Sequence, residues 1–294
     1  MLLCAGLGTR LRPLTDSLPK PLVPVGDRPL LAHLAQALLD AGFSRAVVNS
    51  HWKSEKISEY SMSSPITLNV VHEPRIRGVA GGIAGARALL EPPIVVWNGD
   101  VLLESPPPLA AMLERVRVSG GACLAVADAA EAGTLGLGAR GCVVRARGRS
   151  FGSEERGADY VGLAALGRRA LSELPAQGCL IGDYLLPRLA LGEVVETQLI
   201  RGGWHDVGSA SGYASANRAW LARHANAGAA GYVHPGARVA AGVELRHSVV
   251  GAGASVSGRG VVSGCIVWPG ALAMAPLSDV AVAPGASLSL VGAP

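Results

Sequence analysis

The amino-acid sequence predicts an α/β fold: a doubly wound sheet with helices on both faces, followed by a short β-helix. Three observations lead to this prediction. Strand and helix signals alternate over residues 1 to about 125, glycine-containing turns follow two of the predicted strands, and small apolar residues recur every six positions near the carboxyl terminus. The chain of 294 residues is long enough for two domains of ordinary size, which we place at residues 1–227 and 228–294.

The first half of the chain contains the alternating elements. Five segments have the composition of buried strands: residues 1–5, 44–50, 66–73, 93–100 and 121–127. The segments between them have helical spacing: residues 29–42, 52–60, 80–90 and 107–117. Such alternation implies a parallel sheet, whose ligands gather beyond the carboxyl ends of the strands. The first strand is short, so either the natural start lies upstream or this edge of the sheet is trimmed.

Beyond residue 125 the pattern changes twice. Residues 126–226 are less regular, with strands expected at 141–149, 158–166 and 193–200 and helices at 181–191 and 209–224. After His224 charged residues nearly vanish, and small apolar residues recur every six positions, at Val233, Val239 and Leu245 and again at Val250, Val256 and Val262. A period of six with glycine-rich turns is the signature of a β-helix of about 18 residues per coil, which leaves three or four coils. The alternative, a disordered tail rich in glycine and alanine, does not explain the spaced apolar positions.

The composition argues against several classes of protein. Apolar residues make up 49% of the chain and charged residues 16%, as in a globular protein with an ample core. The net charge of +4 is small and the cationic residues are dispersed, so nucleic-acid binding is not indicated. The five cysteines lie singly, which argues against a zinc site or a disulfide framework and favours a reduced, cytoplasmic protein. No apolar run is long enough to span a membrane, and the amino-terminal segment is too short for a signal peptide.

The stretch LCAGLGTRLRPLTDSLPKPLVPVG, residues 3–26, holds the strongest chemical signal. A Gly-x-Gly turn after a strand lets backbone N–H groups approach a phosphate closely, and here it places Arg10 and Arg12 beside the triphosphate tail. Lys20 is one of only three lysines in the chain and stands between two prolines, which restrict the backbone around it. A compact ammonium held in this way suits the α-phosphate of a nucleotide, where an arginine would be bulkier.

This stretch resembles the signature of the sugar-1-phosphate nucleotidylyltransferases, or NDP-sugar pyrophosphorylases, in which a Gly-x-Gly-Thr-Arg turn precedes a Pro-Lys-Pro-Leu segment. The resemblance continues in HEPRIRGVAGGIAGA (residues 72–86), VVWNGDVL (residues 95–102) and GGWHDVGSASGYASANRAWL (residues 202–221). The repeats near the carboxyl terminus are similar to the β-helix that many members carry. The resemblance therefore implies a Rossmann-like nucleotidyltransferase domain followed by a short left-handed parallel β-helix.

Members of this family join a nucleoside triphosphate to a sugar 1-phosphate and release pyrophosphate, with Mg²⁺ neutralising the phosphates. The resemblance implies two catalytic cations, Arg10 and Lys20, and two metal ligands, Asp100 and Asp206. Both aspartates stand at otherwise uncharged strand ends, which agrees with the preference of Mg²⁺ for one or two carboxylates together with phosphate and water. The residues implied in nucleotide binding are Gly6, Gly8, Thr9, Glu73 and Gly78.

The sequence departs from the family pattern at two places. Val79 stands where the family usually has threonine, so a hydroxyl is lost there. The lysine that many members place on the sugar phosphate is also missing, because no lysine follows Lys56. Counting from the preceding glycine turn puts Arg149 at that position, where its guanidinium fork could bind the phosphate through two hydrogen bonds. Arg147 and Arg156 are alternatives for this role.

The resulting hypothesis is a cytoplasmic enzyme that transfers a guanylyl group to mannose 1-phosphate or a related sugar. A uridylyltransferase for an amino-sugar or muramic-type 1-phosphate is the alternative enzyme, and a non-catalytic regulatory subunit that binds nucleotide-sugar is the alternative of another class. A hexapeptide acyltransferase, which would use His247, ranks last. We expect a nucleoside triphosphate and a sugar 1-phosphate as partners, a homo-oligomer, and neither nucleic acid nor membrane. Residues 228–294 are expected to serve packing and self-association and to contribute no group to the reaction.

Overall fold

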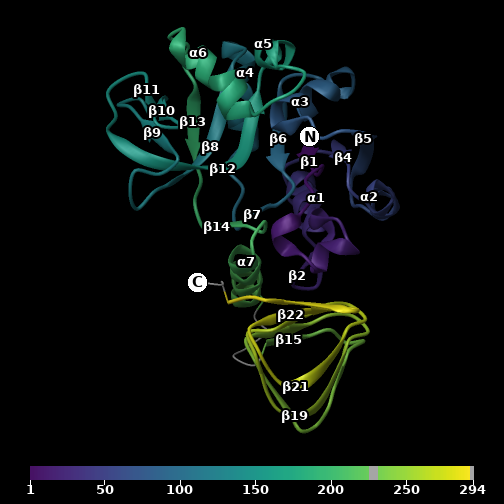
Figure 1. The fold of residues 1–294 in the computed structure, drawn as a ribbon. Coiled ribbons are helices and arrows are strands. Elements are labelled where there is room, and N and C mark those ends of the chain that lie inside the picture. The colour runs from purple at the N-terminus through teal and green to yellow at the C-terminus, as the bar shows by residue number, and fades with distance from the viewer. Residues whose placement is uncertain (225–230, 292–294) are drawn as a thin grey trace. The chain divides into compact units, whose positions relative to one another are not determined.

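The computed structural model of the chain describes residues 1–224 and 231–291, and its contacts divide the chain into two compact units. Unit 1 consists of Met1–Gly6 and Ala35–Gly203, and unit 2 consists of Leu7–Leu34 and Trp204–Pro294. Each unit therefore combines an early and a late stretch of the chain, as the colours of Figure 1 show. The predicted domain boundary between residues 227 and 228 falls outside the described residues. Across the described parts of the chain, none of the helices combines the length and the apolar character that crossing a membrane requires.

Unit 1 is built on a mixed sheet. Its four parallel strands stand in the order β5-β4-β1-β6, with the bounds Thr67–His72, Arg45–Ser50, Leu2–Leu3 and Ile94–Asn98. β12 (Arg156–Leu166) pairs antiparallel with β6 and with β8 (Ala122–Asp128), and β13 (Glu196–Leu199) runs parallel to β8. Further strands of this unit are β7 (Val101–Leu103) and the antiparallel β9 (Leu135–Leu137), β10 (Val143–Ala146) and β11 (Arg149–Ser150).

The expected parallel arrangement holds for the strands of the first half of the chain and is wrong for the strand that joins them. β1, β4, β5, β6 and β8 run in one direction, whereas β12 lies between β6 and β8 in the opposite direction. The reason is the length of the connections that lead into β12. Parallel neighbours need a crossover of a dozen or more residues, whereas the connections among β9, β10, β11 and β12 are of hairpin length.

The helices of the first half begin and end close to their predicted positions: α1 (Leu30–Asp40), α2 (Ser54–Ser61), α3 (Gly78–Gly85) with the turn η4 (Arg87–Leu89), and α4 (Leu109–Ser119). Gly42, with a φ of +87°, follows α1, and the N–H of Phe43 donates to the carbonyl of Leu38 at 2.9 Å, as at a glycine-terminated helix end. The second half adds α5 (Arg168–Glu173), the π-helical turn η5 (Leu180–Leu185) and α6 (Leu186–Ala190). Buried apolar side chains from these helices and the sheet form the core of unit 1, among them Ile83, Val96, Leu124 and Leu171.

Unit 2 contains the early loop and one long helix. The loop folds into three 3₁₀ turns, η1 (Thr9–Leu11), η2 (Leu14–Asp16) and η3 (Lys20–Leu22), and the hairpin of β2 (Pro24–Val25) and β3 (Arg28–Pro29). β14 (Trp204–Asp206) precedes α7 (Ala210–Arg223). The side chain of Ser209 accepts a hydrogen bond from the N–H of Gly212 at 3.1 Å and so caps the start of α7.

The rest of unit 2 is the repeat segment, residues 231–291, a stack of parallel strands. Its strands are β15 (Gly231–Val233), β16 (Arg238–Val239), β17 (Val243–Arg246), β18 (Ser248–Val250), β19 (Ser255–Ser263), β20 (Ile266–Val267), β21 (Leu272–Ser278), β22 (Val280–Ala283) and β23 (Ala286–Ser289). Tyr232 pairs with Val249 and Val249 pairs with Ile266, so the repeat is 17 residues rather than about 18. β23 turns back antiparallel on β22 and ends the stack.

The turn between β2 and β3 gives a prediction for stability. Gly26 has a φ of +64°, and a Cβ added there would lie 2.1 Å from two ring atoms of Trp220. Gly26→Ala should therefore combine backbone strain with a clash in a packed site and lower the free energy of unfolding by about 3 kcal/mol or more. Gly42→Ala is the matched control, because Gly42 also has a positive φ but no atom within 4 Å of an added Cβ. It should lose only about 1 kcal/mol, and equal losses in urea titrations of the two variants would contradict this account.

His33 predicts a loss of stability on acidification. Burial lowers the pKa of His33 from its ordinary value of 6.5, and its Nε2 lies 2.8 Å from the carbonyl of Val25, to which it donates as the neutral ring. The unfolded chain therefore binds a proton that the folded chain does not, and stability falls as the pH drops below 6.5. His33→Gln should flatten this part of the profile of unfolding free energy between pH 7.5 and pH 5. The same slope in the variant and the native protein would exclude His33 as its source.

Candidate functional site

The strand order of unit 1 reverses at β1, which lies between β4 and β6. In sheets of this kind ligands bind outside the carboxyl ends of the strands at the reversal. The segment Cys4–Gly6 follows β1, and Gly99 and Asp100 follow β6. The N–H of Gly99 donates to the carbonyl of Leu3 at 2.9 Å, and an added Cβ on Gly99 would lie 2.6 Å from Sγ of Cys4. The start of the glycine turn at Gly6 and the predicted metal ligand Asp100 therefore leave the sheet side by side.

Glu73 reaches the same edge of the sheet, but its carboxylate is already engaged. Its Oε1 accepts from Nδ2 of Asn49 at 2.8 Å, and its Oε2 accepts from the N–H of Arg77 at 3.3 Å. Oδ1 of Asn49 in turn accepts from the N–H of Cys4 at 2.8 Å. Only 4% of Glu73 is exposed. The carboxylate thus ties the end of β1 to the turn before α3, and contact with a nucleotide base stays a prediction.

Gly78 needs its small side chain for a contact between two backbone segments. It has a φ of +74°, and an added Cβ would lie 2.5 Å from the carbonyl oxygen of Gly178. That carbonyl accepts from the N–H of Ala80 at 2.9 Å, and the N–H of Gly178 donates to the carbonyl of Arg77 at 2.8 Å. The close approach expected at Gly78 is therefore present, with the Gly178 peptide as the partner. Val79, which replaces the family threonine, packs against the core of unit 1.

In unit 2 the glycine turn packs on the stem of Lys20. Gly8 is left-handed, with a φ of +67°, and an added Cβ would lie 3.2 Å from Cβ of Lys20 and 3.1 Å from Cγ2 of Thr15. Oγ1 of Thr15 donates to the carbonyl of Gly8 at 2.8 Å. Thr9 begins the short turn η1, so no long helix follows the glycines. The two halves of the predicted phosphate site, the turn and the lysine, are therefore in direct contact.

Two further predicted residues meet in unit 2, from opposite ends of the chain. Nη2 of Arg10 lies 3.5 Å from Oδ2 of Asp206, and 63% and 42% of the two side chains are exposed. Oδ1 of Asp206 accepts from the N–H of Gly208 at 2.7 Å. Gly208 is a residue that the sequence reasoning missed: a Cβ there would lie 2.5 Å from Nη2 of Arg10. Because the pair is exposed and its attraction is weak, either group can turn to a ligand.

The aspartates suit a hard divalent cation that keeps most of its water and phosphate ligands. Among the described residues, no three His, Cys, Asp or Glu side chains gather into a ready-made metal cage. Asp206 has a half-exposed carboxylate oxygen held only by Arg10, and Asp100 lies at the end of a strand in unit 1. One or two carboxylates of this kind are what Mg²⁺ uses beside phosphates. The donor set therefore fits, and the assignment of both ligands stays a prediction.

The three arginines considered for the sugar phosphate have different surroundings. Arg149 lies on β11 with its guanidinium carbon 5.5 Å from the ring centre of Phe151, and β10, β9 and β12 separate β11 from β6 in the strand order. Arg156 forms an ion pair with Asp128. Nη2 of Arg147 donates to Sγ of Cys179 at 3.2 Å. The structure therefore does not bring Arg149 to the reversal of strand order, and its role stays a prediction.

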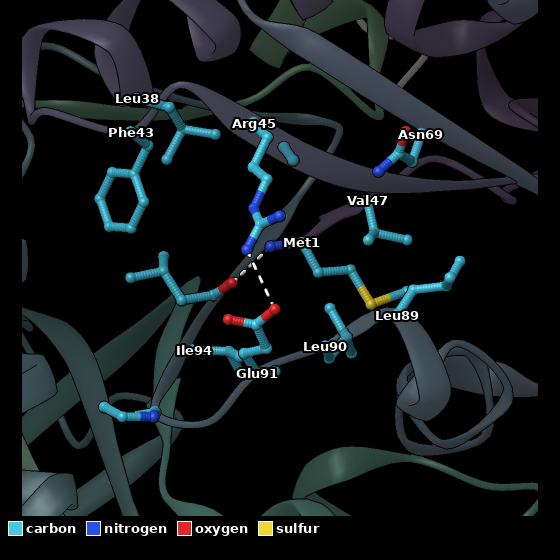
Figure 2. Close-up of a pocket in the computed structure, with 13 residues that line it drawn as sticks. Met1, Leu38, Phe43, Arg45, Val47, Asn69, Leu89, Leu90, Glu91 and Ile94 are labelled. Atoms are coloured by element: carbon cyan, nitrogen blue, oxygen red, sulfur yellow. Dashed lines mark hydrogen bonds and ion pairs between the residues drawn. The ribbon is translucent and has the colours of Figure 1, made fainter.

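A cavity of about 200 Å³ opens at the opposite end of the same strands. Figure 2 shows its lining, in which Met1, Val47 and Ile94 come from β4, β6 and the residue before β1, and Arg45 forms an ion pair with Glu91 at 3.1 Å. These residues lie at the amino ends of the parallel strands. The cavity is therefore separate from the carboxyl-end site where Asp100 and Glu73 stand.

Comparison with known proteins agrees with this geometry. Residues 1–137 match the Nucleotidyl transferase family. A mannose-1-phosphate guanyltransferase of Pichia angusta is 41% identical over 43% of this chain and 36% of its own length. An N-acetylmuramate alpha-1-phosphate uridylyltransferase of Neisseria meningitidis is 41% identical over 35% of this chain and 47% of its own length. A mannose-1-phosphate guanylyltransferase of Arabidopsis thaliana is 29% identical over 75% of this chain and 64% of its own length.

Solved structures extend the likeness in fold. A UDP-glucose pyrophosphorylase from Acinetobacter baumannii superposes with a TM-score of 0.64 at 20% identity, over 76% of this chain and 93% of its own. HddC from Yersinia pseudotuberculosis, solved in complex with GMP-PN, gives a TM-score of 0.61 at 22% identity, over 74% of this chain and 97% of its own. The chain therefore has a mixed α/β, nucleotidyltransferase-like fold. Against the curated relatives described above it spans between about a third and two thirds of their length.

Proposed function

We propose that the chain transfers a nucleotidyl group from a nucleoside triphosphate to a sugar 1-phosphate, giving a nucleotide-sugar and pyrophosphate. The observation that carries this proposal is the contact of the Gly8 turn with the stem of Lys20, in the same unit as the Arg10–Asp206 pair. These residues lie in the motifs on which the resemblance rests. The named relatives, which include guanylyl- and uridylyltransferases of sugar 1-phosphates, support the reaction class.

The reaction forms a bond between an oxygen of the sugar phosphate and the α-phosphorus, and breaks the bond from that phosphorus to the oxygen bridging to the β-phosphorus. The electron pair of the broken bond leaves with pyrophosphate. Lys20 stabilises the negative charge that grows on the α-phosphate, and the exposed Arg10 guanidinium binds the leaving phosphates once it leaves Asp206. Backbone N–H groups at Gly6, Gly8 and Thr9 orient the triphosphate. Enzymes of this family generally use a divalent metal; we propose Mg²⁺, held by Asp100 and Asp206, which would neutralise phosphate charge.

The finer assignments are also proposals. Guanylyl transfer to mannose 1-phosphate is our first choice, and uridylyl transfer to an amino-sugar or muramic-type phosphate is the alternative, because relatives of both kinds match the chain. We propose that the repeat segment is a left-handed hexapeptide β-helix, supported by its parallel ladders with an offset of 17 residues. A cytoplasmic homo-oligomer remains our expectation, and light scattering of the purified chain tests its assembly.

A grid of the common nucleoside triphosphates against a panel of sugar 1-phosphates, read by pyrophosphate release, tests the function. We expect one dominant combination, GTP with mannose 1-phosphate. A dominant signal with UTP and an amino-sugar phosphate would select the alternative enzyme. Tight binding of a nucleotide-sugar, without pyrophosphate release in any combination, would select the regulatory subunit and overturn the enzymatic proposal.

A further inference from the structure

Two buried hydrogen bonds link the repeat segment to the loop that carries Lys20. Nε1–H of Trp268, in the turn after β20, donates to the phenol oxygen of Tyr213 at 2.9 Å. The Tyr213 hydroxyl donates to the carbonyl of Pro24 at 2.7 Å. Trp268 is 4% exposed and Tyr213 is fully buried, and all three residues belong to unit 2. The link therefore runs from β20 through α7 to β2 without meeting solvent.

The direction of these bonds is fixed by chemistry. An indole N–H can only donate, so the phenol oxygen must accept from Trp268. The single hydroxyl hydrogen of Tyr213 is then directed to the only other partner, the Pro24 carbonyl. Burial raises the pKa of the Tyr213 phenol, so the hydroxyl keeps its proton at neutral pH. Trp268 thus determines which way the Tyr213 hydroxyl points.

Pro24 stands at the base of a short and stiff path to Lys20. The N–H of Val23 donates to the carbonyl of Lys20 at 3.1 Å, and the N–H of Leu22 donates to that of Pro19 at 2.9 Å. The prolines on both sides of Lys20 restrict the backbone further. A displacement of Pro24 is therefore transmitted to Lys20 instead of being absorbed by a flexible loop.

The repeat segment and α7 hold this loop at two more points. Oδ1 of Asn217 accepts from the N–H of Gly26 at 2.9 Å, and its Nδ2 donates to the carbonyl of Tyr213 at 3.0 Å. β23, the last strand of the repeat segment, lies against η2, which contains Thr15, the partner of the Gly8 carbonyl. The repeat segment therefore supports both the lysine and the glycine turn.

We propose that Trp268 is a positioning residue for nucleotidyl transfer, which holds Lys20 in place through Tyr213 and Pro24. The proposal rests on the function proposed above. It agrees with the expectation that the repeat segment contributes no group to the reaction, because Trp268 acts only through another residue. A reactive group displaced by about 1 Å can lose about 10²-fold in rate, so the loss of one link in this path should lower kcat by about tenfold and leave KM for the sugar 1-phosphate unchanged.

The test compares Trp268→Phe, Tyr213→Phe and the double variant, since each removes a hydrogen-bonding group and keeps a ring. We expect each single variant to lower kcat about tenfold, and the double variant to lose no more than either, because both break one path. Val256→Ala, which truncates a buried side chain of β19 outside the path, is the control and should keep its kcat. Losses that multiply in the double variant, or an equal loss in Val256→Ala, would overturn the proposal.

A second measurement does not depend on activity. The chain has only Lys20, Lys53 and Lys56, so reductive methylation with ¹³C labels three lysines, and Lys20→Arg assigns the signal of Lys20. Trp268→Phe and Tyr213→Phe should move or broaden the Lys20 signal alike, whereas the Lys53 and Lys56 signals and the whole Val256→Ala spectrum stay unchanged. An unchanged Lys20 signal in both Phe variants would refute the link. If the native protein transfers no nucleotidyl group, the proposed function fails and this spectrum alone decides the structural link.

Discussion

Replacement of Lys20 by alanine is expected to lower kcat by about 10²–10³, the range for the loss of one preorganised charged group at a reacting phosphate. The fold should survive, because the side chain beyond Cβ contributes little to the contact with Gly8. Pyrophosphate release at saturating substrates, with circular dichroism as a check on folding, measures the effect. Lys56→Ala is the matched control, since Lys56 is a surface lysine that pairs only with Glu59 at 3.5 Å among the printed ion pairs of the described chain.

Lys20→Arg should rescue poorly. The stem of residue 20 is packed against Gly8 and Thr15, so a longer side chain with a planar head cannot shift to bring one positive centre to the same point. We expect a kcat closer to that of the alanine variant than to that of the native protein. Turnover near the native value in both Lys20 variants would remove Lys20 from the reaction.

Asp206→Asn and Asp100→Asn are expected to abolish most activity, and an excess of Mg²⁺ should restore part of it, because an amide is a weaker ligand than a carboxylate for a hard cation. The Asp206 variant also loses its partner for Arg10, an exposed pair that contributes little stability, so both variants should unfold at nearly the native temperature. Asp16→Asn is the matched control, since Asp16 is an exposed aspartate of the same loop paired with Arg12 at 3.2 Å.

Binding of Mn²⁺, followed by electron paramagnetic resonance in the presence of nucleotide, provides a readout independent of turnover. Both aspartate variants should bind Mn²⁺ more weakly than the native protein and than Asp16→Asn. Removal of metal with a chelator should stop pyrophosphate release from the native protein. Full turnover in the chelator, or unchanged Mn²⁺ binding in both variants, would contradict the assignment of these ligands.

Much of the fold could be predicted from local patterns. The apolar spacing of α1 and the glycine that ends it placed that helix to within two residues, and the strands before and after it were found in the same way. The direction of β12 could not be predicted, because direction depends on which strands become neighbours and no residue of β12 encodes that by itself. The repeat of 17 residues also lies outside a period of six, since turns of unequal length change the number of residues in a coil.

The candidate site was predictable where a motif carries it and not where a fold assembles it. The residues from Gly8 to Lys20 are close in sequence, and their contact follows from one loop. The meeting of Arg10 with Asp206 was implied only through the family resemblance. The second partner of each polar group was missed: Asn49 beside Glu73, Gly178 beside Gly78 and Trp268 beside Tyr213 all come from distant segments. A polar residue near the end of a buried strand, as in AVVNS, was the available signal for Asn49.

The composition of unit 2 has a consequence for the order in which the molecule is completed during synthesis. Residues 7–34 emerge from the ribosome first, yet their packing partners begin at Trp204. The bonds from Gly26 to Asn217 and from Tyr213 to Pro24 span 191 and 189 residues. Contacts of such sequence separation form late in folding. We therefore expect the lysine-bearing loop to remain unsupported through most of translation and a nascent chain that stops before the repeat segment to be inactive although most of unit 1 has already folded.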